Sequence, residues 1–211
     1  MTDTKPIRRI AIIGTGVIGA SWTALFLAKG LQVVATDPAP NAEAALRKFV
    51  ETAWPALKRL GLSPGASQSN LKFTADLAEA VAGADLVQEN GPERIDFKQK
   101  LYGQLDELLP PNVIIASSSS GLTMSEIQKG AASHAERCVI AHPFNPPHLI
   151  PLVEIVGGAK TSAETIKRAD EFYTSIGRKT VRINKGCPAT SPTACRPHWR
   201  ARSTTSSPRV S

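Results

Sequence analysis

Short β-branched runs and helical segments alternate along this sequence almost from its first residues, and this alternation restricts the fold more than any other feature. The runs are apolar along their whole length, which is typical of strands buried on both faces. Repeated strand–helix units of this kind predict an α/β fold with a doubly wound, mainly parallel sheet. Helices should cover both faces of that sheet, and the crossovers should be right-handed.

The pattern fixes approximate bounds for each element. The expected strands are Arg9–Ile13, Gln32–Thr36, Leu71–Thr74, Asp85–Gln88, Val113–Ser117, Cys138–His142, Leu152–Val156 and Thr180–Ile183. The expected helices are Val17–Lys29, Asn41–Leu60, Asp76–Ala82, Glu93–Leu109, Thr123–Lys129 and Ala163–Ile176, with a polar loop over Ser63–Asn70. A chain of 211 residues is long enough for one such domain with a substantial core.

Composition narrows the class of protein further. No apolar run is long enough to cross a bilayer, and the N-terminus lacks the apolar stretch of a secretory signal. Three cysteines, Cys138, Cys187 and Cys195, have neither a metal-binding spacing nor a disulfide pattern. We therefore expect a cytoplasmic protein without a membrane partner.

The net charge of +7 suggests a nucleic-acid partner at first sight, but its distribution argues against one. Residues 178–211 carry eight basic and no acidic side chains, which leaves residues 1–177 with a net charge of −1. A basic tail is one form of nucleic-acid arm, yet no aromatic interleaving or binding-module signature accompanies it here. We expect no nucleic-acid partner.

A glycine-rich turn joins the first strand to the first helix. It reads Gly14-Thr15-Gly16-Val17-Ile18-Gly19, and Asp37 ends the second strand eighteen residues after Gly19. In a Rossmann-type domain the glycines permit a tight turn, let the backbone approach a pyrophosphate and let the helix pack on the strand.

The first helix would then direct unpaired N–H groups at the phosphates, with Gly14, Gly16, Val17, Ile18 and Gly19 lining the cofactor. Asp37 would accept hydrogen bonds from the adenosine ribose and would repel a 2′-phosphate, which favours NAD over NADP. The alternative is a glycine turn selected only for packing.

Reactive side chains follow neighbouring strands. Ser117–Ser120 ends one expected strand, His142 ends the next with Asn145 shortly after it, and Glu154 lies in the strand that follows. Because ligands of open α/β sheets bind outside the carboxyl ends of the strands, Ser120, His142 and Asn145 should share one edge. A neutral histidine accepts a hydroxyl proton while hydride leaves the same carbon, and a carboxylate such as Glu154 would orient it.

Each of these residues also has a plainer interpretation. Serines after a strand are commonly loop caps, and a histidine before proline is commonly structural. A metal set of His142, His148 and Glu154 is conceivable, but its spacing matches no standard site, and we expect no metal. Glu89 and Glu93 are most simply surface groups near a strand end.

Together these residues resemble the L-3-hydroxyacyl-CoA dehydrogenase family, which includes the carnitine and gulonate dehydrogenases. The similarity covers about residues 7–185 and is most specific in the block from His142 to Glu154. It implies that His142 is the catalytic base, Glu154 its partner carboxylate and Ser120 a contact to the substrate oxygen. It also implies that Ser120, Glu93, Lys98 and Asn145 line the nicotinamide half of NAD.

The reaction that the resemblance implies is oxidation of the 3-hydroxy group of an L-3-hydroxyacyl-CoA or a related 3-hydroxy acid. In acyl-CoA members of the family, lysines after the second helix contact CoA, whereas Ser63–Asn70 is uncharged here. Gly91-Pro92-Glu93-Arg94 also resembles the carnitine and gulonate branch. A free 3-hydroxy acid is therefore an alternative to a CoA thioester.

The chain departs from the family after Lys185. The family continues with Pro-Gly-x-Ile-x-Asn-Arg and an all-helical domain that closes the cleft and forms a homodimer. Gly186–Ser211 is instead a basic segment rich in Pro, Ser and Thr, which we expect to be disordered. We divide the chain into an NAD-binding domain, 1–185, and this tail, 186–211.

A shifted reading frame would explain the tail. Codons permitted for Gly186–Ser211 also encode, when shifted, Val-Pro-Gly-His-Ile-Ala-Asn-Arg followed by an amphipathic, helix-like segment. The hypothesis is a frameshift near Lys185–Gly186. The alternative function is then a non-catalytic, NAD-binding remnant with an exposed apolar patch where the helical domain belongs.

Overall fold

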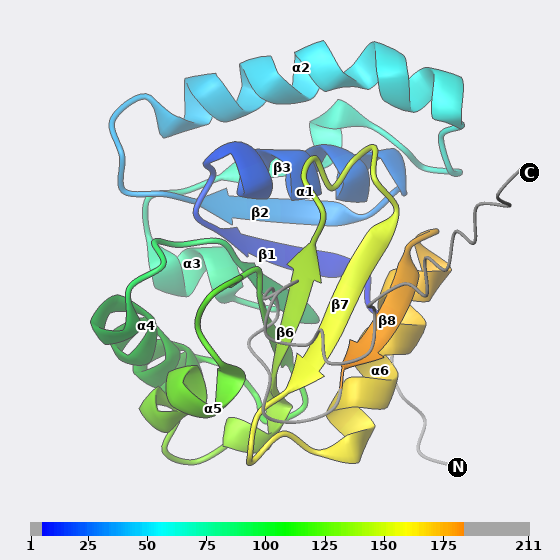
Figure 1. Cartoon of the computed structure of the whole chain (residues 1–211). Coiled ribbons are helices and arrows are strands. Elements are labelled where there is room, and N and C mark those ends of the chain that lie inside the picture. Colours follow the sequence, from blue (N-terminus) through cyan, green and yellow to red (C-terminus); the bar gives the residue numbers. More distant parts are fainter. Residues whose placement is uncertain (1–5, 184–211) are drawn as a thin grey trace, which may run out of the picture.

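A computed structural model of the chain describes residues 6–183. The expectations for the tail, including Cys187 and Cys195, lie outside these residues. One eight-stranded sheet runs through the molecule in the order β3-β2-β1-β4-β5-β6-β7-β8 (Figure 1). The strands are β1 Arg9–Ile13, β2 Gln32–Thr36, β3 Leu71–Phe73, β4 Leu86–Glu89, β5 Ile114–Ser117, β6 Cys138–Pro143, β7 Leu152–Gly157 and β8 Lys179–Ile183.

The sheet is mainly parallel, as expected for a doubly wound fold. Every neighbouring pair is parallel except β6 and β7, which run antiparallel. The α-helices are α1 Val17–Ala28, α2 Ala42–Leu60, α3 Leu77–Val81, α4 Ile95–Leu108, α5 Met124–Ile127 and α6 Ala163–Ser175. Three short 3₁₀ turns complete the described elements: Gln68–Asn70, Gln128–Gly130 and Ala135–Arg137.

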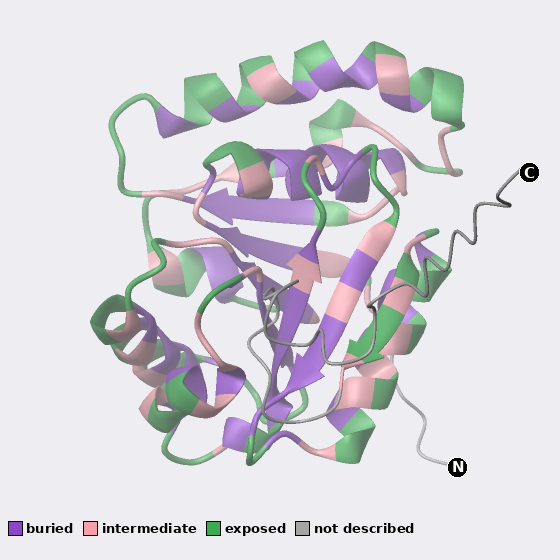
Figure 2. Ribbon diagram, viewed as in Figure 1, coloured by how far each residue is buried: buried purple, intermediate pink, exposed green. Residues whose placement is uncertain are grey.

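Alternate residues of a strand point to opposite faces of the sheet, and here both faces carry apolar side chains. Helices therefore cover both faces. Ile10 and Ile12 of β1 join a core beneath α1, α2 and α6, whereas Ala11 and Ile13 join a second core beneath α3, α4 and α5. Figure 2 shows the inner strands buried and the outward faces of the helices exposed. Edge strand β8 is mostly exposed.

Local sequence explains where several helices begin. The side chains of Asp76, Thr123 and Ser162 each accept a hydrogen bond from the backbone N–H three residues later, which caps α3, α5 and α6. The expected helix from Glu93 begins instead at Ile95, after an irregular turn through Pro92. The expected helix over 123–129 splits into α5 and a 3₁₀ turn.

Among residues 6–183 the structure contains no helix long and apolar enough to cross a membrane.

Candidate active site

The glycine turn adopts the close backbone packing that its sequence predicts. Gly14 has a φ of +82°, and a Cβ on it would lie 2.8 Å from the carbonyl oxygen of Asn90. A Cβ on Gly19 would lie 1.9 Å from the carbonyl oxygen of Gly14. Glycine is therefore required at both positions, because any side chain would collide with backbone.

Gly16 differs from these two glycines. A Cβ there would meet nothing within 4 Å, so protein packing does not account for a glycine at this position. Gly16 is the N-cap residue of α1, and it has no side chain that could bond to the N–H groups of the first turn. In that turn Val17 is 62% exposed and Ile18 is half-buried. An open cradle of backbone amides at a helix N-terminus fits the pyrophosphate of a dinucleotide.

Asp37 lies beside this turn, at the end of β2. Its Oδ2 accepts hydrogen bonds from the backbone N–H and the hydroxyl of Thr15, at 2.7 and 3.1 Å. Its Oδ1 accepts from the N–H of Ala39 at 2.9 Å. Asp37 thus braces the glycine turn itself, a role that the sequence did not indicate, and its carboxylate lies where an adenosine ribose is expected.

His142 and Glu154 form a direct pair. They face each other in the antiparallel pairing of β6 and β7, with His142 Nδ1 3.1 Å from Glu154 Oε2. Both side chains are mostly buried, at 13% and 17% exposure. Burial lowers the pKa of His142 below its ordinary value, although the negative charge of Glu154 and its hydrogen bond act in the opposite direction. The imidazole is therefore neutral at pH 7 and able to accept a proton.

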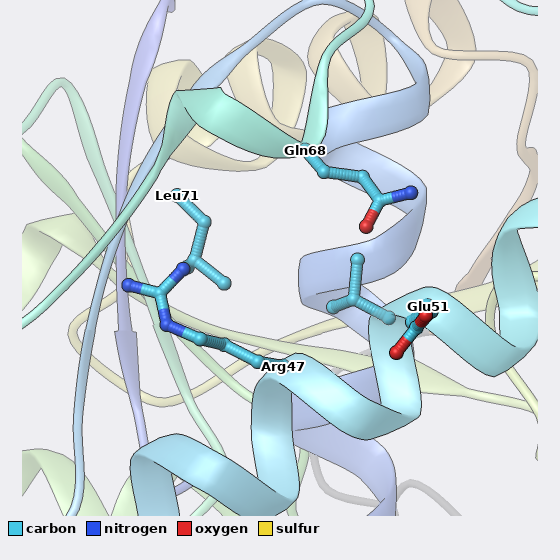
Figure 3. A pocket seen from close by; sticks show the side chains of 5 residues that line it. Arg47, Glu51, Gln68 and Leu71 are labelled. Atoms are coloured by element: carbon cyan, nitrogen blue, oxygen red, sulfur yellow. The ribbon is translucent and has the colours of Figure 1, made fainter.

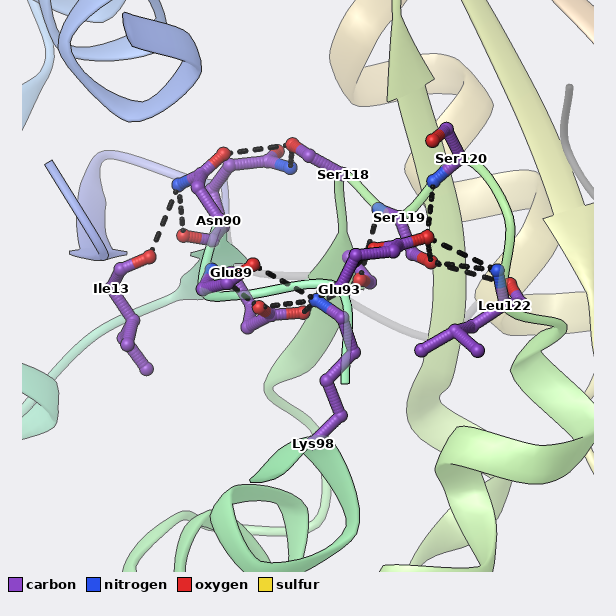
Figure 4. A network of polar contacts seen from close by, with 12 residues as sticks. Ile13, Glu89, Asn90, Glu93, Lys98, Ser118, Ser119, Ser120 and Leu122 are labelled. Carbon is purple, nitrogen blue, oxygen red and sulfur yellow. Dashed lines mark hydrogen bonds and ion pairs between the residues drawn. The ribbon is translucent and has the colours of Figure 1, made fainter. Parts of the chain in front are cut away.

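Glu93 holds the loop that carries Ser120. Its Oε1 accepts hydrogen bonds from the backbone N–H groups of Ser120, Gly121 and Leu122, at 3.0, 2.6 and 3.1 Å. Figure 4 shows Glu93 reaching from the segment after β4 to this loop. The side chain of Glu93 is 40% exposed, so it lies near the surface as expected but is firmly bonded.

The expectation that Glu89 is a surface group is wrong. Glu89 is wholly buried and lies 2.7 Å from Lys98 Nζ, which is itself only 1% exposed. The Ser117 hydroxyl donates to the other carboxylate oxygen of Glu89 at 2.6 Å. Glu89 is buried because β4 is an inner strand, and the positive charge of Lys98 makes a buried carboxylate tolerable.

Lys98 also contacts the candidate site through Glu93, since its Nζ lies 3.9 Å from Glu93 Oε2. Because Lys98 is almost wholly buried, the structure places it behind Glu93 rather than on open surface.

Asn145 is exposed and lies in the connection between β6 and β7, where its peptide bond to Pro146 is cis. Two residues that sequence reasoning did not single out anchor this connection. Ser21 of α1 accepts a hydrogen bond from the His148 N–H at 3.0 Å and bonds to the His148 ring at 2.6 Å. Arg178 donates to the carbonyl oxygen of Pro147 at 2.9 Å.

His148 is thus bonded to α1 rather than grouped with His142 and Glu154. Within residues 6–183 no cluster of three or more His, Cys, Asp or Glu side chains could hold a metal ion.

Figure 3 shows a separate hollow between α2 and the segment leading into β3. Its lining residues are Arg47, Val50, Glu51, Gln68 and Leu71. None of them belongs to the predicted site, and a neighbouring hollow shares Arg47 and Leu71 with it. We assign no chemistry to this surface.

Parallel strands β1, β2, β4, β5 and β6 bring the glycine turn, Asp37, Glu93, Ser120 and His142 to one edge of the sheet. The turn geometry and this shared edge place the fold among the dinucleotide-binding domains of dehydrogenases. The family model described as "3-hydroxyacyl-CoA dehydrogenase, NAD binding domain" matches residues 9–187. The chain belongs to this family, and its cofactor is NAD.

Curated relatives agree with this family. L-carnitine dehydrogenase of Pseudomonas putida is 52% identical over 182 residues, which are 86% of this chain and 56% of that protein. L-carnitine dehydrogenase of Streptomyces coelicolor is 50% identical over 188 residues, 89% of this chain and 59% of that protein. The chain therefore spans less than three-fifths of the length of these relatives.

Solved structures share the fold. A 5-formyl-3-hydroxy-2-methylpyridine 4-carboxylic acid 5-dehydrogenase, described as an NAD⁺-dependent dismutase, matches with a TM-score of 0.80 and 41% identity over 87% of this chain and 60% of that one. The 3-hydroxybutyryl-CoA dehydrogenase of Escherichia coli matches with a TM-score of 0.78 and 28% identity over 85% of this chain and 39% of that one.

Proposed function

We propose that this chain is the NAD-binding part of an enzyme that oxidises the 3-hydroxy group of a small 3-hydroxy acid, with L-carnitine as the first candidate substrate. The observation that supports this most directly is the His142–Glu154 pair at the edge of the sheet that carries the glycine turn. NAD, when bound, supplies the hydride acceptor. The products are the 3-keto acid, NADH and one proton.

In the proposed reaction His142 moves the proton. Because an ionised Glu154 only accepts hydrogen bonds, the proton of a neutral His142 lies on Nδ1, which leaves the Nε2 lone pair for the substrate hydroxyl. Proton transfer to Nε2 accompanies loss of hydride from the same carbon, and Glu154 stabilises the imidazolium that forms. Ser120 would donate a hydrogen bond to the substrate oxygen as it becomes a carbonyl.

The cofactor residues in this proposal are those of the sequence prediction. Gly14, Gly16, Val17, Ile18 and Gly19 would hold the pyrophosphate, and Asp37 the adenosine ribose. Glu93, Lys98, Ser120 and Asn145 would surround the nicotinamide half, with Lys98 acting from behind Glu93.

Two features favour a free hydroxy acid over a CoA thioester. The segment 63–70 carries no charged side chain with which to bind CoA phosphates. The two curated relatives described above are L-carnitine dehydrogenases at 50–52% identity. The alternative, an L-3-hydroxyacyl-CoA substrate, would place the chain in fatty-acid metabolism. In either case we propose a cytoplasmic location, where a free thiol such as Cys138 stays reduced.

A second candidate is a non-catalytic NAD-binding module, which the glycine turn and Asp37 would support without turnover. Large apolar side chains are exposed in the β6–β7 connection (Phe144, Leu149 and Ile150) and on β8 (Val181). They are candidates for the surface on which a helical domain packs. Dimerisation through such a domain stays a prediction.

The test measures NADH binding and turnover side by side on the full chain. NADH affinity is followed by fluorescence, and turnover by NADH formation with L-carnitine and with L-3-hydroxybutyryl-CoA. His142→Gln is the control for turnover. Turnover that depends on His142 supports the dehydrogenase, whereas NADH binding without turnover supports the module. The absence of NADH binding would contradict both.

A further inference from the structure

Three consecutive serines, the last residue of β5 and the two that follow it, donate hydrogen bonds to three different side chains at or just after the end of β4. The pairs are Ser117 with Glu89 at 2.6 Å, Ser118 with Asn90 at 2.7 Å, and Ser119 with Glu93 at 2.6 Å. The pairing of β4 with β5 sets Ser117 beside Glu89, so the following residues of both strands continue side by side. Figure 4 shows Ser118, Ser119 and Ser120 in sequence along this line of contacts.

Ser119 differs from an ordinary loop cap. A cap would bond chiefly to the backbone of its own loop, and the contacts of the Ser119 hydroxyl to Leu122 are long, at 3.2 and 3.3 Å. Its short hydrogen bond goes to Glu93 Oε1, which belongs to another segment of the chain. Ser119 is 2% exposed, so the donor end of this bond is buried, while the acceptor Glu93 is partly exposed.

The same Glu93 oxygen accepts the backbone N–H of Ser120. One carboxylate oxygen therefore joins the buried hydroxyl of Ser119 to the main chain of the next residue. On its other side, Glu93 Oε2 lies 3.9 Å from the buried Lys98 ammonium. The carboxylate is held from both sides, and its position in turn fixes the loop.

We propose that Ser119 is a positioning residue that sets the place of Ser120 by holding Glu93 Oε1 against the Ser120–Leu122 backbone. This inference rests on the proposed function in one respect only: it assumes that Ser120 is the residue that meets the substrate oxygen. The effect on the loop itself does not depend on that assumption.

Electrostatics agree with this arrangement. Burial raises the pKa of Glu93, but the hydrogen bond from Ser119, the N–H groups of Gly121 and Leu122 and the charge of Lys98 together bring it below its ordinary value. Among these lowering contributions, the one from Ser119 is the largest. Glu93 is therefore ionised at pH 7 and is a strong acceptor for the loop.

The first measurement follows the backbone N–H signals of Ser120, Gly121 and Leu122 by NMR during an acid titration of the full chain. In the wild type these signals should move together as Glu93 is protonated. Ser119→Ala should move that midpoint to higher pH and speed hydrogen exchange at the three N–H groups. Ser119→Thr, which keeps the hydroxyl, should restore both.

The matched control is Ser125→Ala. Ser125 lies in α5 and accepts a hydrogen bond from the Ala159 N–H at 2.9 Å, with no contact to Glu93. This variant should leave the titration of the loop unchanged. If Ser119→Ala behaves like Ser125→Ala, or if the three signals do not titrate together in the wild type, the positioning role is wrong.

The second measurement concerns turnover. Ser119→Ala should lower kcat/KM for the hydroxy acid by about tenfold, and this loss should exceed any rise in the Kd for NADH that follows from moving Glu93. A rise in the NADH Kd that matches the loss in kcat/KM would overturn the proposal, because Ser119 would then serve the cofactor. If the wild type has no turnover, the proposed function fails, and the NMR titration still decides the role of Ser119.

Discussion

Glu154 Oε2 lies 3.1 Å from His142 Nδ1 because the two residues are direct partners in the antiparallel pairing of β6 and β7. The pair is mostly buried, so the carboxylate acts on the imidazole with little screening by water. With the Glu154 carboxylate as the acceptor, the proton of neutral His142 lies on Nδ1 and Nε2 is left as the basic atom.

Replacing Glu154 by Gln should therefore change both the rate and its pH dependence. Burial lowers the pKa of His142 and the charge of Glu154 raises it, so removal of that charge should lower this pKa further. The acid limb of kcat/KM should move to lower pH, while the plateau falls by about 10²-fold or more. A pH–rate profile of both proteins checks this, and an acid limb that moves to higher pH would contradict the pairing.

Acid should destabilise the fold in a window set by two histidines. Burial lowers the pKa of His142 and of His148 below 6.5, so the unfolded chain binds more protons just below that pH. The free energy of unfolding therefore keeps the full contribution of these neutral histidines above about pH 6.5. It falls as the pH drops towards their pKa values in the folded state.

Urea unfolding at about pH 7.5 and about pH 5.5 measures this loss. His148→Gln should reduce it, because one of the two groups no longer titrates. Carboxyl groups with lowered pKa values, such as Asp106, change the free energy of unfolding only at more acidic pH. They therefore do not affect the difference in stability between these two pH values. Equal stability at both pH values would refute the histidine origin.

Gly16 and Gly19 should respond differently to the same substitution. A Cβ at Gly19 collides with the Gly14 carbonyl oxygen at 1.9 Å, so Gly19→Ala should lower the free energy of unfolding by about 2 kcal/mol or more. Gly16→Ala meets nothing within 4 Å, so it should fold normally but weaken NADH binding by about tenfold. Thermal unfolding and NADH titration of both variants test this, and normal NADH binding by Gly16→Ala would remove Gly16 from the cofactor site.

Lys98→Met should destabilise the chain because it leaves the Glu89 carboxylate buried without its cation. A loss of about 3–5 kcal/mol is expected for breaking such a pair. The double variant Glu89→Gln/Lys98→Met removes both charges and should recover a large part of that loss. Urea unfolding of the two variants measures the difference, and equal losses would show that packing rather than charge accounts for the effect.

The coding DNA should decide the nature of residues 186–211, which lie outside the described structure. If a frameshift near Lys185–Gly186 produced this segment, the shifted frame should encode Pro-Gly-His-Ile-Ala-Asn-Arg followed by a helix-like segment. Sequencing of fresh template across these codons tests the hypothesis. Codons that forbid the shifted reading would end it.

Much of the local geometry of the candidate cofactor site could be predicted from the sequence. The spacing of Gly14, Gly16 and Gly19 after an apolar run indicates a tight turn, which depends only on the local backbone. Asp37 follows at the end of the next strand. The helix starts at Asp76, Thr123 and Ser162 are equally local, because each cap bonds within three residues. Strand periodicity also placed Ser120 and His142 at strand ends.

The sequence by itself thus determined the α/β class, the glycine turn and the edge that carries the reactive residues, because short-range backbone sterics and apolar periodicity encode them. Tertiary structure alone decided that β7 runs antiparallel to β6, which brings Glu154 to His142, since strand direction depends on long-range pairing. Tertiary structure also decided that Glu89 is buried, because its inner strand places it against Lys98 and Ser117. These contacts join residues from different elements of the fold, so no local sequence pattern predicts them.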